Sequence, residues 1–192
     1  MKAIKQIILI ILFLTLLFTS FKTYSQDSYK DIGYWHNYVL KDVYKSMDSK
    51  TKSMYLKNPS LLQDKMIEIL VDADPKIFNK EKLKQAQIEL NIIFKDVEWS
   101  QTGLINFIKP LKTQVSSELY NQLVAIINSK NRDSLTTKIK KLRNSIFSKK
   151  DQVIADVFLE VHDASSNFWS NQGKKNWMAR LAWDAAGAIV GS

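Results

Sequence analysis

Apolar residues recur three and four positions apart along most of the chain after residue 30, and this periodicity restricts the fold more than any other feature of the sequence. The clearest stripe consists of Ile32, Trp35, His36, Val39, Leu40, Val43, Tyr44 and Met47. Such spacing places these side chains on one face of an α-helix. No segment alternates in the manner of a strand or carries paired hairpin turn signals. The sequence therefore predicts an all-α fold, a bundle in which each helix buries one stripe.

Capping residues and prolines divide this bundle into about six or seven helices. Ser60 and Gln63 are spaced as a capping box, and Asp74 ends that helix because it precedes Pro75. A helix is predicted next from Asn79 to about Val97, with Leu83, Leu90, Ile93, Phe94 and Val97 facing inward. Gly103 and Pro110 bracket a short apolar piece, and further helices are expected over 115–127, 133–147 and from a cap at Ser148 to about Gly173.

The first 25 residues have the pattern of a signal peptide. Lys2 and Lys5 precede an apolar run over 7–18, and residues 23–25 form a small-x-small cleavage pattern that leaves Gln26 as the first mature residue. The run is shorter than the roughly 20 apolar residues that cross a bilayer. We therefore expect residues 1–25 to be removed and 26–192 to form one helical domain, periplasmic or secreted, although an uncleaved anchor is the alternative.

Composition narrows the chemistry of this domain. The chain has no cysteine, which excludes disulfides, zinc–thiolate sites, thiol nucleophiles and lipid attachment through cysteine. Residues 1–25 contain three lysines and no acidic residue, so their removal lowers the formal net charge from +9 to +6. Because the chain is predicted to be exported, acidic proteins or anionic envelope surfaces are more natural partners for this charge than nucleic acid.

The chain has two histidines, and each has a structural and a functional interpretation. His36 lies on the apolar stripe, and Val39 and Leu40 occupy the positions where a second metal ligand would stand. We favour a buried, hydrogen-bonded His36 over a general base or metal ligand. His162 lies beside Glu160 and Asp163, a cluster that we interpret as a solvated helix edge. A two-helix site joining both histidines is geometrically possible.

No sequence motif indicates catalysis or a cofactor. The chain lacks GxGxxG, P-loop, HExxH and GxSxG patterns. We predict no catalytic, cofactor-binding or metal-binding residue and no cofactor. The basic stretch from Lys138 to Arg143 is interleaved with Ile139 and Leu142, which favours a solvated helix face over a docking site for an acidic surface.

The tail over 176–191 differs from the rest of the chain in its tryptophans, alanines and glycines. Gly187 and Gly191 are four residues apart, a spacing that lets two helix backbones approach closely. The apolar run is too short to span a bilayer and contains Asp184 just after Trp183. We favour a last core helix, with membrane association as the alternative.

Three segments together resemble a known group of sequences. The segments are Gly33-x-x-His36-Asn37-x-x-Leu40, Ser165-Ser166-x-x-Trp169 and Asp184-Ala-Ala-Gly187-Ala-x-x-Gly191. This combination resembles uncharacterised secreted bacterial proteins that open with a GxxHN helix and close with an Ala/Gly-rich helix. The resemblance implies an exported helical protein and marks Gly33, His36 and Asn37 as positions of interest. It implies no activity.

Three functions follow as hypotheses. The first is an exported, non-catalytic helical protein that binds another envelope or extracellular protein. The second is a membrane-associated or toxin-like factor that acts through the helix over 176–191. The third is a metal-dependent or hydrolytic enzyme centred on His36.

Overall fold

The described part of the chain consists of helices and the turns and loops that join them. The computed structural model describes residues 31–46, 48, 50, 51, 54, 58–94 and 100–171. Over these residues it contains seven α-helices, a short 3-10 helix and no strand, which confirms the predicted all-α bundle. The elements are α2 (Ile32–Ser46), α4 (Pro59–Ala73), α5 (Lys80–Phe94), α6 (Gln101–Ile108), η2 (Lys109–Thr113), α7 (Ser117–Ile127), α8 (Arg132–Asn144) and α9 (Lys149–Asn171).

Several sequence predictions concern residues outside this description. They are the signal peptide over 1–25 with the new terminus at Gln26, the end of the third predicted helix at Val97, and the tail with Trp183, Asp184, Gly187 and Gly191. The side chains of Leu90, Ile93, Phe94 and Trp169 also lie outside it.

Side-chain caps begin several of the helices. Asn79 Oδ1 accepts a hydrogen bond from the Lys82 amide at 3.0 Å, and Ser148 Oγ accepts one from the Asp151 amide at 3.2 Å. These two caps agree with the predicted starts of α5 and α9. Each cap satisfies one of the amide groups that the first turn of a helix leaves without an intrahelical partner.

The predicted capping box at Ser60 and Gln63 is wrong. The helix begins at Pro59, and the residue before it, Asn58, makes no side-chain cap. Gln63 is instead buried and bonds across to α5, where its Nε2 donates to Asn91 Oδ1 at 3.0 Å and its Oε1 accepts from Gln87 Nε2 at 3.1 Å. Proline at the first helical position needs no cap for its missing N–H, so Gln63 is free for this tertiary contact.

Three further boundaries differ from the sequence predictions. Gly103 lies within α6, because the helix is capped earlier by Ser100, whose Oγ accepts from the Gly103 amide at 3.0 Å. Val115 precedes α7, which starts after its cap Ser116. Ile146 is 95% exposed, since α8 ends at Asn144 and the extended backbone of Ser145 interrupts the helical stripe.

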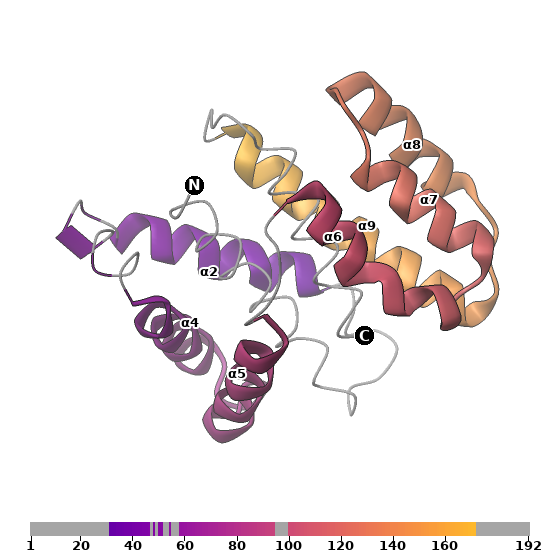
Figure 1. The fold of residues 1–192 in the computed structure, drawn as a ribbon. Coiled ribbons are helices and arrows are strands. Elements are labelled where there is room, and N and C mark those ends of the chain that lie inside the picture. The colour runs from indigo at the N-terminus through magenta and orange to yellow at the C-terminus, as the bar shows by residue number, and fades with distance from the viewer. Residues whose placement is uncertain are drawn as a thin grey trace.

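Helices α2 and α9 pack side by side in the middle of the molecule (Figure 1). Helices α4 and α5 lie on one side of this pair, with α4 against α2. On the other side α6, η2, α7 and α8 follow one another, and α8 returns to α9. The first and last described helices thus form the joint between the two halves of the fold.

Candidate functional site

Gly33 lies at a close contact between α2 and α9. It is buried, and a Cβ added to it would stand 3.0 Å from the backbone oxygen of Glu160 and 3.1 Å from the Cβ of Ala164. Both distances are shorter than ordinary van der Waals contact. The glycine of the GxxHN motif therefore permits close approach of two helix backbones.

Asn37 makes a side-chain hydrogen bond between α2 and α9 near the same contact. Its side-chain nitrogen Nδ2 donates to the backbone oxygen of Ala164 at 3.0 Å. A backbone carbonyl only accepts hydrogen bonds, so this contact fixes which end of the amide faces α9. The other end, Oδ1, then lies 3.3 Å from Nδ1 of His36.

This arrangement assigns the tautomer of His36. Because Asn37 Oδ1 is an acceptor, Nδ1 of the neutral imidazole carries the proton and Nε2 is the acceptor. The hydroxyl of Ser165 on α9 lies 3.5 Å from Nε2, at the long limit of a hydrogen bond. The motif residues of α2 thus meet Glu160, Ala164 and Ser165 on two successive turns of α9.

His36 is fully buried and uncharged at neutral pH. Burial lowers the pKa of its imidazole from 6.5 to about 4, against a smaller upward effect of the hydrogen bond to Asn37. The buried, hydrogen-bonded position predicted for His36 from its place on the apolar stripe agrees with its position in the structure.

The order hydroxyl, imidazole, amide is also the order of a nucleophile, its base and an orienting group. A hydrolase would need space for a substrate carbonyl beside Ser165 Oγ. Ser165 and His36 are both fully buried, and a methyl group added at Gly33, three residues before His36, would already stand 3.0–3.1 Å from atoms of α9. Over the described residues, this geometry suits the joining of two helices better than attack on a substrate.

The interpretation of His162 as part of a solvated edge is wrong. Glu160 is exposed, but His162 is only 8% exposed and its ring stacks on Phe158, with the centroids 6.4 Å apart. The reason is the position of α9 between α2 and α8, which covers more than one face of the helix. His162 stands four residues after Phe158, so its place on the apolar stripe was a signal in the sequence.

Asp163 ties this region to α8. Nη2 of Arg143 donates to both carboxylate oxygens, at 2.8 and 3.1 Å, and Nδ1 of His162 lies 3.1 Å from Oδ1. Partial burial raises the pKa of the Asp163 carboxyl, but the hydrogen bonds from His162 and Arg143 outweigh it and hold the pKa below its usual value. Among the residues described, no group of three or more histidine, aspartate or glutamate side chains is placed to hold a metal ion.

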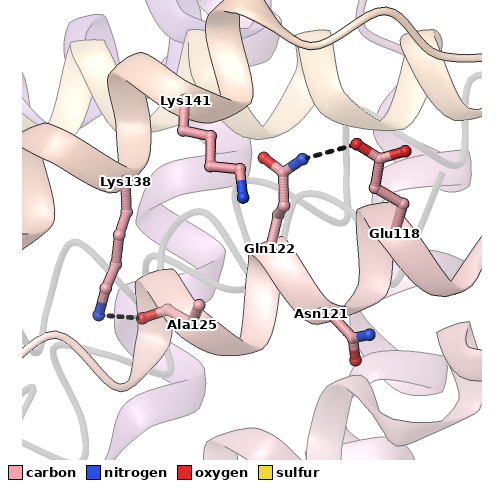
Figure 2. A pocket seen from close by; sticks show the side chains of 6 residues that line it. All are labelled: Glu118, Asn121, Gln122, Ala125, Lys138 and Lys141. Atoms are coloured by element: carbon pink, nitrogen blue, oxygen red, sulfur yellow. Dashed lines mark hydrogen bonds between the residues drawn. The ribbon is translucent and has the colours of Figure 1, made fainter.

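A hollow of about 420 Å³ lies between α7 and α8 (Figure 2). Its lining consists of Glu118, Asn121, Gln122, Ala125, Lys138 and Lys141. The lining residues from α7 were not among the candidate site residues predicted from the sequence. Gln122 is nevertheless a visible exception, because it is a polar residue between Leu119 and Ile126 on the apolar stripe and is buried like them.

The basic stretch of α8 forms one wall of this hollow. Leu135, Ile139 and Leu142 are buried while Lys140 and Lys141 are exposed, as expected for a solvated helix face. Lys138 departs from that expectation. Its half-buried ammonium donates to the backbone oxygen of Ala125 at 2.7 Å, near the carboxyl end of α7.

Comparisons with protein-family models, with characterised proteins and with solved structures found no significant match to this chain. The resemblance to secreted GxxHN proteins therefore stays a hypothesis. In the part of the chain that the structure describes, no helix has both the length and the apolar character that a membrane span requires.

Proposed function

We propose that this chain is an exported, non-catalytic helical protein whose role is to bind an acidic protein of the envelope or the exterior. The observation that carries the proposal is the enclosure of the GxxHN motif. Gly33, His36 and Asn37, the residues with the best claim to a special role, contact α9 inside the fold. Residues used in this way support a rigid scaffold rather than a reaction.

The charge of the molecule supports an acidic partner. The chain carries a formal net charge of +9, or +6 without residues 1–25, and α8 contributes five basic residues against one acidic residue. Lys140 and Lys141 are exposed on that helix. Complementary charge accelerates association and favours partners of the opposite sign.

Affinity capture from envelope or culture-supernatant extracts tests this function. The tagged chain should retain a specific protein partner, and raising the salt concentration should weaken the complex. Reversal of the two exposed α8 charges, Lys140→Glu with Lys141→Glu, should abolish capture. The matched control reverses two exposed lysines of α5, Lys80→Glu with Lys82→Glu, and should retain the partner.

Two results would contradict the proposal. One is the absence of any partner that the intact chain retains above a tag-only background. The other is equal loss of capture in the α8 and α5 variants, which would indicate charge attraction without a defined surface.

A further inference from the structure

The amide of Gln122 has an orientation that its neighbours determine. Its Nε2 lies 3.3 Å from Glu118 Oε1, and a carboxylate only accepts hydrogen bonds. The same nitrogen donates to Ser145 Oγ at 2.9 Å, while that hydroxyl donates to the backbone oxygen of Lys141 at 3.0 Å. The NH₂ end therefore faces Glu118 and Ser145, as Figure 2 shows for Glu118.

The opposite end of this amide is an acceptor without a donor. Gln122 is 8% exposed, and its Oε1 has no hydrogen-bond partner in the described part of the chain. A buried carbonyl oxygen without a donor has given up its hydrogen bonds to water without a replacement, which destabilises the fold. A native fold retains such a group most readily where something else supplies the donor.

The two lysines of the hollow differ in availability. The Lys138 ammonium is occupied, since it donates to Ala125 O at 2.7 Å and to Ser129 Oγ at 3.2 Å. Lys141 is exposed and makes no ion pair within the described residues. Its ammonium points toward Gln122 (Figure 2).

We propose that the hollow between α7 and α8 binds an acidic peptide segment. A carboxylate of the segment pairs with the Lys141 ammonium, and a backbone N–H of the segment donates to Gln122 Oε1. A volume of about 420 Å³ is in the range of known ligand sites, about 300–1,000 Å³. The inference deepens the proposed function by giving the acidic partner a place to bind, and it rests on that function.

Peptide fits this lining better than nucleic acid does. The unsatisfied acceptor requires a donor, and a peptide presents a backbone N–H at every residue other than proline. A phosphodiester backbone presents none. Lys138 is already used within the protein, so Lys141 is the lysine of the hollow that remains for a backbone with a phosphate at every nucleotide.

Side-chain amide spectra of the ¹⁵N-labelled chain test the proposal. The probe is the peptide acetyl-Ala-Glu-Gly-Asp-Ala-amide, compared with acetyl-Ala-Gln-Gly-Asn-Ala-amide and with a six-residue oligothymidylate. The acidic peptide should shift the Gln122 side-chain NH₂ resonances in a saturable manner. The amide peptide and the oligonucleotide should bind at least about tenfold more weakly, since each lacks one of the two interactions.

Variants inside and outside the hollow distinguish binding at this site from general charge attraction. Lys141→Met and Gln122→Leu should each weaken binding of the acidic peptide about tenfold. Lys82→Met removes an exposed lysine of α5, outside the hollow, and should bind like the parent. Lys141 is exposed, so its variant will fold even if Gln122→Leu does not.

Equal weakening by Lys82→Met, shifts confined to residues away from α7 and α8, or tighter binding of the oligonucleotide would overturn the inference. The captured partner serves as a separate test. If Lys141→Met still captures it, the proposed function stands and the hollow is not its site. If the peptide binds the hollow and no partner is captured, the site stands and the function fails.

Discussion

The side-chain amide of Asn37 donates a hydrogen bond to the backbone carbonyl of Ala164, 3.0 Å away in space and 127 residues later in the chain. This bond joins α2 to α9, the central pair of helices, and the other described helices pack on the two sides of this pair. His36 and Gly33 contact α9 at the same crossing. The GxxHN motif is therefore a long-range joint, and its residues are testable as one.

Removal of the Asn37 side chain should weaken this joint. Asn37→Ala removes the hydrogen bond to Ala164 O and the contact of Asn37 Oδ1 with His36 Nδ1, so the free energy of unfolding should fall by about 1–3 kcal/mol. Urea denaturation measures it. Lys41→Ala, exposed on the same helix, should change stability by less than about 0.5 kcal/mol. Equal effects of the two changes would contradict the role given to Asn37.

The buried imidazole of His36 should make the fold sensitive to mild acid. The pKa of His36 is about 4 in the folded chain and 6.5 in the unfolded chain. Between these two pH values the unfolded chain therefore holds a proton that the folded chain lacks. Acid then favours unfolding. The free energy of unfolding should be full above pH 6.5 and fall by about 1.4 kcal/mol per pH unit toward pH 4.

The variant His36→Gln should lose this slope between pH 6.5 and 4, and its stability should be lower than that of the parent at neutral pH. Burial acts to raise the pKa of the Asp64 and Asp163 carboxyls, but hydrogen bonds from Lys84 and Gln87, and from His162 and Arg143, hold both below 3.8. The stability that these two ionised carboxyls contribute is therefore lost at pH values below the window in which His36 titrates. Parallel pH curves for the parent and His36→Gln would show that His36 is not the responsible group.

Ser165 should behave as a packing residue and not as a nucleophile. Its contact with His36 Nε2 is 3.5 Å long, so loss of that contact in Ser165→Ala should contribute no more than about 1 kcal/mol. A fluorophosphonate probe should leave Ser165 unlabelled in the folded chain. Labelling that disappears in Ser165→Ala would instead support the hydrolase hypothesis centred on His36.

Export should leave a mature chain that begins at Gln26. The basic residues, short apolar run and cleavage pattern over 1–25 all predict this. Intact-mass spectrometry of periplasmic or secreted material measures it directly. A chain that retains Met1 to Ser25 would contradict both the cleavage and the compartment on which the choice of partner rests.

The helices themselves were predictable from the sequence because their signals are local. Apolar spacing revealed the stripes of α2, α7 and α8, and Asn79 and Ser148 marked two helix starts correctly. A cap and a stripe depend on residues within one or two turns of each other. The all-α class followed from these signals alone.

The polar residues inside the bundle were not predictable in the same way. Gln63 has the spacing of a capping box, yet it bonds to Gln87 and Asn91 on another helix. Gln122 is buried because α8 packs against α7, and His162 is buried because α9 lies between α2 and α8. Both residues stand on apolar stripes, but the sequence does not state which helices become neighbours. The burial of His36 was predictable because the residues around it on the same helix face are mostly apolar. Its neighbour Ser165 was not predictable, because it lies on another helix that the tertiary fold brings close.

The melting temperature of Gly33→Ala tests the central claim most directly, because the two possible effects have opposite signs. Alanine is the better helix former by about 1 kcal/mol, so a glycine with open space beside it would give a more stable variant. At Gly33 the new Cβ would meet Glu160 O at 3.0 Å and Ala164 Cβ at 3.1 Å, and both atoms are fixed by the α9 backbone.

We therefore predict that Gly33→Ala lowers the melting temperature, with a net loss of about 1–3 kcal/mol from overpacking. Adding Ala164→Gly, which removes the second of these contacts, should make the effect of Gly33→Ala smaller than it is in the parent background. An unchanged or raised melting temperature in Gly33→Ala would contradict the account of the GxxHN motif as the joint between α2 and α9.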